Sequence, residues 1–166
     1  AAQIKAMKSV SGTLKLDLAQ FRELEAFATF GSELDAVSRA QLDRGERLVE
    51  LLKQPLNSPM SVEEQVVSIF AGTEGVLDDL PVREVRRFEN ELLEWFRTRH
   101  AGILSEIRDS GAIPANDALG AAVASFKTQF LTSISQSNAT TGLADPRATD
   151  FEPVGDPESD KTLETE

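Results

Sequence analysis

The sequence predicts an all-α protein: a bundle of about six helices followed by a disordered acidic tail. Apolar residues recur at helical spacing through most of the chain. No stretch alternates apolar and polar residues as a half-buried strand would, and the β-branched residues are scattered. Hydrophobic residues make up 40% of the 166 residues, which is enough to build one buried core.

The first predicted helix ends at Gly31, because glycine adopts the left-handed backbone at a helix C-terminus without strain. Its apolar residues spread over a wide face, as expected of a helix that packs on more than one side. These residues are Leu14, Leu18, Phe21, Leu24, Phe27 and Phe30.

A second helix is predicted over residues 35–54, and a break follows because proline cannot continue a helix at Pro55 or Pro59. The candidate core positions of this helix are Val37, Leu42, Leu48, Leu51 and Leu52.

Ser61 and Glu64 match the S-x-x-E pattern of a capping box, which predicts a third helix that Gly72 and Gly75 end. A fourth helix opens near Pro81, since proline is favoured in a first turn, and bends near residues 100–102. The last helix follows Gly111 and Pro114. Its apolar residues are Leu119, Val123, Phe126, Phe130 and Ile134, at spacings of three and four.

Beyond residue 135 the helical pattern stops, so the sequence predicts a helical domain over residues 1–135 and a disordered tail over residues 136–166. The tail is rich in Pro, Gly, Ser, Thr and acids, and cannot bury enough apolar area to offset the entropy of ordering. From Asn138 onward it holds eight acidic residues against Arg147 and Lys161.

The net charge of −11 argues against a nucleic-acid partner and against docking to an anionic membrane. No apolar run approaches the roughly 18 residues of a membrane span, so we expect no direct membrane insertion. The absence of cysteine excludes disulfides and thiolate metal sites.

The residues predict no catalytic site and no metal site. Neither G-x-x-x-x-G-K-[ST] nor G-x-G-x-x-G is present, so a nucleotide phosphate has no recognisable cradle. His100, the only histidine, has no local ligand partner and fits a helix junction. Asp78 and Asp79 fit a solvated turn, and Glu63 and Glu64 fit the capped start of a helix.

Two further features have structural interpretations. Trp95 and Phe96 lie in register with the core positions, so we interpret them as packing residues. The mixed charges of residues 83–91 fit either a solvated helix face or the rim of an interface, and the sequence does not separate these alternatives.

Several long strings occur in the order of a known family. They are AMKSVSGTLKLDLAQFRELEAFATFGSELD, QLDRGERLVELLKQ, SPMSVEEQVVSIFAGTEGVLDDLP and RRFENELLEWF. Together they resemble the C-terminal helical domain of the alpha subunit of the F-type ATP synthase, from Ala1 to about Leu131. The strings EEQVVSIFAGTEG and VREVRRFE look most similar to actinobacterial members.

The resemblance implies a structural and regulatory part of the ATP synthase head, with no autonomous catalysis. The implied partners are the beta and gamma subunits, with delta and b in the whole complex, at the cytoplasmic face of the bacterial plasma membrane. The P-loop and the arginine finger are expected upstream of Ala1. ATP, ADP and Mg are therefore expected only in a full-length subunit, with no cofactor in residues 1–166.

The resemblance also implies two sets of site residues. Gln54 matches one of two family glutamines near the adenine of the non-catalytic nucleotide site, whereas Leu56 stands where the second would be and cannot form a side-chain hydrogen bond. The turn that resembles the stalk-facing loop consists of Phe30, Gly31, Ser32, Glu33, Leu34 and Asp35. Simple helix capping by Ser32 or Asp35 explains the same residues. An alternative function is a free-standing acidic helical module that binds other proteins.

Overall fold

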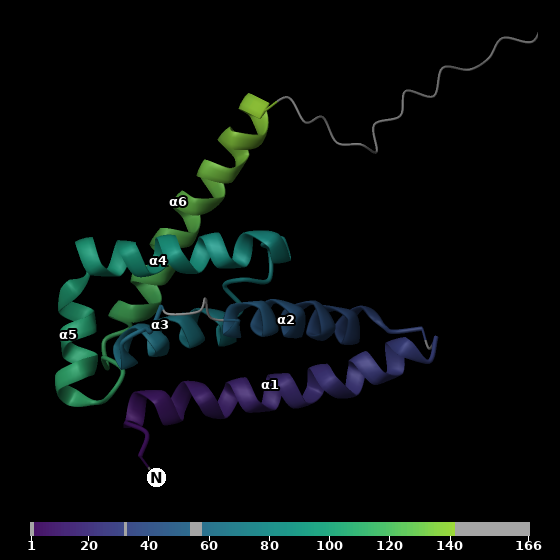
Figure 1. The fold of residues 1–166 in the computed structure, drawn as a ribbon, viewed down its shortest axis with the longest axis horizontal. Helices are drawn as coiled ribbons and strands as arrows, with labels where there is room; N and C mark the ends of the chain where they lie inside the picture. The colour runs from purple at the N-terminus through teal and green to yellow at the C-terminus, as the bar shows by residue number, and fades with distance from the viewer. Residues whose placement is uncertain (1, 32, 54–57, 142–166) are drawn as a thin grey trace, which may run out of the picture. The chain divides into compact units, whose positions relative to one another are not determined.

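The computed structural model describes residues 2–31, 33–53 and 58–141, with side chains as far as residue 137. These residues form six α-helices and one short 3-10 helix, and they include no strand, so the predicted all-α class is confirmed (Figure 1). The helices are α1 (Lys5–Thr29), α2 (Ala36–Leu52), α3 (Val62–Thr73), η1 (Val82–Glu84), α4 (Val85–Arg99), α5 (Ala101–Ser110) and α6 (Ala118–Thr141).

The chain divides into two compact units, Ala1–Thr132 and Ser133–Glu166. The first unit contains α1 to α5 and the first part of α6. The second unit contains the rest of α6.

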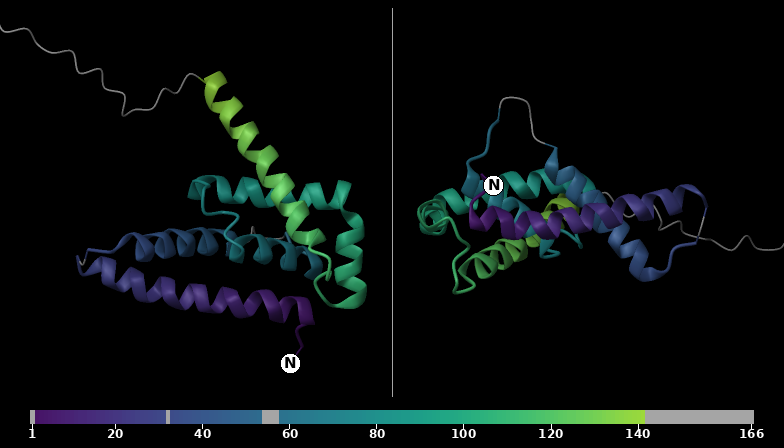
Figure 2. Two further views of the ribbon diagram at one scale, coloured as in Figure 1. Left: turned by 180° about the vertical axis from the view of Figure 1, so that it is seen from behind. Right: turned by 90° about the horizontal axis from the view of Figure 1, so that it is seen from below.

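In the first unit, α1 and α2 run side by side as a hairpin, and α3 lies against both (Figures 1 and 2). The two helices approach closely at Gly45, where a β-carbon would come within 2.3 Å of the Phe21 ring. Any residue with a β-carbon at position 45 would therefore clash with the Phe21 ring. Gly31 ends α1 with a φ of 74°, as the sequence predicts.

The core of the first unit is built from apolar side chains of every helix. Phe88 of α4 lies 5.2 Å from Phe126 and 5.1 Å from Phe130, between ring centroids, in edge-on contacts with α6. Phe96 is fully buried, which confirms its predicted packing role, and Trp95 is half-buried beside it.

Four predicted packing positions are wrong, because their side chains are exposed. Phe27 and Phe30 are 59% and 85% exposed, and Val37 is 69% exposed. These three residues lie at the free end of the α1–α2 hairpin, beyond the helices that cover its other end (Figure 1). Leu52 is 44% exposed as the last residue of α2.

Two predicted helix ends also differ. Gly72 lies inside α3, where a β-carbon would come within 2.7 Å of a Leu48 methyl group, so it serves close packing, and Gly75 follows the helix. The last helix extends to Thr141, past the expected end at residue 135, because the first glycine or proline after that point is Gly142. The remainder of the predicted tail, residues 142–166, lies outside the described residues.

Candidate functional site

The loop between α1 and α2 carries the predicted partner-facing residues. Phe30 closes α1, with its amide donating to the Phe27 carbonyl at 3.2 Å, and Gly31 turns the chain away. Asp35 caps α2 by accepting a hydrogen bond of 2.7 Å from the Ser38 amide. That hydrogen bond lowers the pKa of the Asp35 carboxyl. Ser32 lies outside the described residues.

The side chains of this loop differ in exposure. Glu33 is exposed and Leu34 is half-buried. Phe27, Phe30 and Val37, which we term the hairpin end, expose three large apolar side chains at one end of the hairpin. Such a group costs hydration free energy in water, so it is typical of a surface that meets another protein. The structure therefore favours helix capping for Asp35 and leaves the aromatic rings available for contact.

The predicted adenine-contacting residue, Gln54, and the departing residue, Leu56, both lie outside the described residues. The chain that leads to them is anchored, because the Arg86 guanidinium donates to the Lys53 carbonyl at 2.5 Å and to the Glu50 carboxylate at 3.2 Å. Hydrogen bonds from Lys53 and Arg86 lower the pKa of Glu50.

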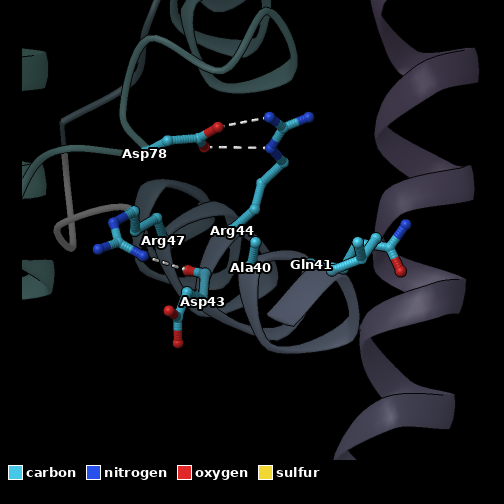
Figure 3. Close-up of a pocket in the computed structure, with 7 residues that line it drawn as sticks. Ala40, Gln41, Asp43, Arg44, Arg47 and Asp78 are labelled. Carbon is cyan, nitrogen blue, oxygen red and sulfur yellow. Dashed lines mark hydrogen bonds and ion pairs between the residues drawn. The ribbon is translucent and has the colours of Figure 1, made fainter. Parts of the chain in front are cut away.

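A cavity of about 340 Å³ opens beside α2 (Figure 3). Arg44 pairs with Asp78 through two hydrogen bonds, of which the one from Nε measures 3.1 Å. Arg47 donates to the carbonyls of Asp43 and Leu80 at 2.6 and 2.7 Å. Both guanidinium groups therefore already have acceptors, and their arrangement ties α2 to the turn after α3. The lining residues are Val37, Ala40, Gln41, Asp43, Arg44, Arg47 and Asp78.

Asp17 of α1 lies near this ion pair. Burial raises the pKa of its carboxyl, and the neighbouring charges of Arg44 and Asp78 act in opposite directions on it. Its Oδ2 atom is buried without a hydrogen-bond partner in the described part of the chain.

Three glutamates are buried at the contacts of α3 with α4 and α5. Arg97 donates to Glu64 at 2.6 Å, Arg108 donates to Glu63 at 2.8 Å, and Ser68 donates to Glu89 at 2.5 Å. Burial raises the pKa of Glu63 and Glu64, but their hydrogen bonds outweigh it and the net pKa of each is lowered. For Glu89 burial prevails, and its pKa is raised.

Sequence reasoning missed most of these pairs. Asp78 and Asp79 were expected to lie in a solvated turn. Asp79 is solvated as expected, with its side chain 71% exposed, but it also accepts a hydrogen bond from Lys127 at 2.7 Å, and Asp78 pairs with Arg44. Such partners are 34 and 48 residues apart in the chain, so no local pattern indicates them. The predicted capping box is confirmed, since the Ser61 amide donates to Glu64 at 3.0 Å.

His100 lies at the junction of α4 and α5, as predicted, with its ring 5.6 Å from that of Phe96. Within the described ranges, no group of three or more His, Cys, Asp or Glu residues could hold a metal ion. In the same residues, no helix is both long and apolar enough to cross a membrane.

Comparison with known proteins gives one consistent family. Residues 3–130 match the family model described as ATP synthase alpha/beta chain, C terminal domain. The chain is 62% identical over 133 residues to an ATP synthase subunit alpha of Acidothermus cellulolyticus, covering 79% of the chain and 24% of the relative. A Mycobacterium tuberculosis subunit alpha is 62% identical over 132 residues, covering 78% and 24%.

A Streptomyces lividans subunit alpha is 57% identical over 134 residues, covering 80% of the chain and 25% of the relative. All three relatives come from actinobacteria, in agreement with the resemblance noted in the sequence. The chain spans about a quarter of the length of these relatives.

Proposed function

The chain belongs to the family of ATP synthase alpha/beta C-terminal domains, and from that premise we propose that it is a non-catalytic part of an ATP synthase head. It acts by presenting rigid helical surfaces to beta subunits and to the central gamma stalk, within a complex that also holds delta and b. The observation that carries the proposal is the family match over residues 3–130 at 62% identity to a subunit alpha.

The hairpin end supports a contact role. Phe30 extends an 85% exposed ring from a loop that both flanking helices hold in place, through Gly31 at one end and the Asp35 cap at the other. An exposed aromatic ring at the end of a helical hairpin is suited to contact the surface of a neighbouring subunit. In the proposed assembly this loop faces the gamma stalk, and Glu33 meets basic groups there.

In this proposal, other parts of the full-length subunit and of the complex bind the nucleotide phosphates and carry out catalysis. Gln54 lies near the adenine of the non-catalytic site, and ATP, ADP and Mg require the phosphate cradle of a full-length subunit. The proposed location is the cytoplasmic face of the bacterial plasma membrane, as part of the whole complex.

A chimeric subunit tests the proposal. The last quarter of the Mycobacterium tuberculosis subunit alpha is replaced by this chain, and the product is combined with the beta and gamma subunits. We expect a complex that purifies as one species and hydrolyses ATP. A chimera that folds but does not join beta and gamma contradicts the proposal and favours a free-standing helical module.

The isolated chain offers a second test. Titration with Mg-ATP should give no dissociation constant below about 1 mM, because one glutamine cannot replace a phosphate cradle. A micromolar dissociation constant for Mg-ATP would contradict the proposal that these residues are non-catalytic and lack a phosphate cradle.

A further inference from the structure

A donor and an acceptor remain unpaired where α1 meets α2. Arg44 binds Asp78 through Nε and Nη2, and its third nitrogen, Nη1, forms no hydrogen bond within the described residues. Oδ2 of Asp17 is buried and has no partner in the same part of the chain. A guanidinium carries five N–H donors in a rigid fork, and an ionised carboxylate accepts on both oxygens. Arg44 therefore keeps free donors on one edge, and Asp17 keeps a free acceptor.

The helix packing places Asp17 opposite Arg44. Asp17 lies one turn before Phe21, and residues four apart share a helix face. The Phe21 ring meets α2 at Gly45, the neighbour of Arg44 in the chain. The charge of Arg44 accordingly acts on the Asp17 carboxyl and opposes burial, which raises the pKa of that group. In Figure 3 the Nη1 atom points away from Asp78, toward the side on which α1 runs.

The guanidinium of Arg44 is confined on one side and has room on another. A β-carbon at Gly75 would come within 2.9 Å of Nη2 of Arg44 and 3.0 Å of Oδ2 of Asp78, so the backbone of the turn after α3 lies directly against the ion pair. Both paired side chains also line the cavity of about 340 Å³ (Figure 3). The guanidinium therefore has space to turn away from Asp78, but none to move deeper into the turn.

We propose that Arg44 exchanges between two carboxylates, Asp78 in the turn after α3 and Asp17 in α1. The structure holds the state in which Asp78 is the partner. Turning toward Asp17 replaces one set of charge-assisted hydrogen bonds by another and gives the buried Oδ2 atom a donor. Because Nη1 already faces α1, its hydrogen bond to Asp17 forms before the two to Asp78 break. The charge of Arg44 is never left without a partner.

The exchange changes which segments of the first unit are tied together. Paired with Asp78, Arg44 holds α2 to the turn after α3. Paired with Asp17, it holds the two helices of the hairpin to each other and releases the turn. Val37 of the hairpin end lines the same cavity as Arg44, so a partner bound at that end acts close to the exchanging side chain. This use of the exchange rests on the proposed function, which supplies the partner, whereas the exchange itself does not.

NMR on the intact 166-residue chain tests the exchange through the guanidinium N–H protons of Arg44. These protons are protected from exchange with water as long as either carboxylate accepts them. We expect D17N and D78N each to keep a protected proton, and D17N/D78N to lose it, with exchange about 10-fold faster than in either single variant. D43N/D78N is the matched control, because Asp43 lines the same cavity and carries the same charge. It should behave as D78N does.

A double-mutant cycle measures the same exchange in the unfolding equilibrium. The coupling between D17N and R44Q is obtained from urea unfolding, once in the wild-type chain and once in D78N. We expect the coupling to change the unfolding constant by less than ~2-fold in wild type and by about 5-fold in D78N, because Asp17 gains Arg44 when Asp78 is lost. With D43N in place of D17N, the coupling should stay below ~2-fold in both backgrounds. The unfolding transitions also establish that each variant is folded.

Two outcomes overturn the exchange. If the Arg44 protons of D78N exchange as fast as those of D17N/D78N, Asp17 does not accept them. If D17N and D43N couple equally to R44Q, any negative charge in the cavity has the same effect, and Asp17 is no specific partner.

The chimeric complex separates this result from the proposed function. A chimera that does not join beta and gamma, while D78N keeps its protected proton, contradicts only the proposed function. Normal assembly together with loss of that proton in D78N contradicts only the exchange of Arg44.

Discussion

Glu64 joins the first turn of α3 to Arg97 of α4. Its Oε1 atom accepts from Nε of Arg97 at 2.6 Å, while its Oε2 atom accepts from the Ser61 amide at 3.0 Å. The Glu64 side chain is 11% exposed and that of Arg97 is 50% exposed. One carboxylate thus caps α3 and holds α4 against it. A substitution of its partner Arg97 should therefore change the stability of the fold.

Arg97→Ala should lower the free energy of unfolding by about 1 kcal/mol at pH 7. The substitution leaves Oε1 of Glu64 without its donor in a largely buried position, and the figure is discounted because water reaches the exposed half of Arg97. Urea unfolding measures the change. Arg83→Ala is the control, since its side chain is 78% exposed and lies 3.7 Å from Glu84, and it should not move the midpoint. Equal losses for both variants would contradict this role of Arg97.

Glu89→Gln should change the pH dependence of stability. Burial raises the pKa of Glu89 in the folded protein. Below the unfolded pKa of about 4.3 both states are protonated, and the carboxyl contributes no difference. As the pH rises towards the folded pKa, only the unfolded state loses its proton, so the wild-type chain loses stability that the amide variant keeps.

The stability of E89Q relative to wild type should therefore increase between pH 4 and pH 8, by a few degrees in Tm for a domain of this size. Thermal unfolding followed by circular dichroism checks the trend. Glu64→Gln provides the opposite sign, because its lowered pKa gives stability above about pH 4.3 that is lost in acid. A constant difference between E89Q and wild type across this range would contradict the raised pKa.

The helices were predictable from the sequence because their signals are local. Apolar spacing, the Ser61–Glu64 capping box and the glycines at positions 31 and 111 each act within one or two turns. The prediction that the turn after α1 faces a partner came only from resemblance to a family and stays a prediction, since the residues of this turn also fit a simple cap. Burial of Glu63 and Glu64 was not predictable, because Arg108 and Arg97 reach them from 45 and 33 residues away.

The exposed apolar residues were mispredicted for a related reason. Periodicity places Phe27 and Val37 on apolar positions of their helices, but it does not say where the neighbouring helix ends. The hairpin end extends beyond α3, so its rings have no cover in the first unit of the chain. Deviations of this kind concentrate where a protein meets a partner.

Gly45→Ala should destabilise the chain by about 2 kcal/mol, because the added β-carbon would come within 2.3 Å of the Phe21 ring between two packed helices. The matched control is Gly12→Ala in α1, where the new atom meets nothing within 4 Å. That change should stabilise the helix by roughly 0.5–1 kcal/mol. Urea unfolding of the two variants should give opposite signs, and a loss of stability at both positions would contradict the close approach at Gly45.

Phe30→Ser should leave the stability of the isolated chain within ~0.5 kcal/mol of wild type, because its 85% exposed ring contributes little to the core. In contrast, Phe88→Ala, at a fully buried ring in contact with Phe126 and Phe130, should cost about 3–5 kcal/mol. In the chimeric subunit, by contrast, F30S should have a measurable effect. The complex should assemble, but its rate of ATP hydrolysis should change severalfold because the contact of Phe30 with the stalk is lost. If F30S unfolds the isolated chain, the ring serves packing. If it leaves ATP hydrolysis by the chimeric complex unaltered, the exposed ring has no partner there, and the hairpin end must meet some other surface.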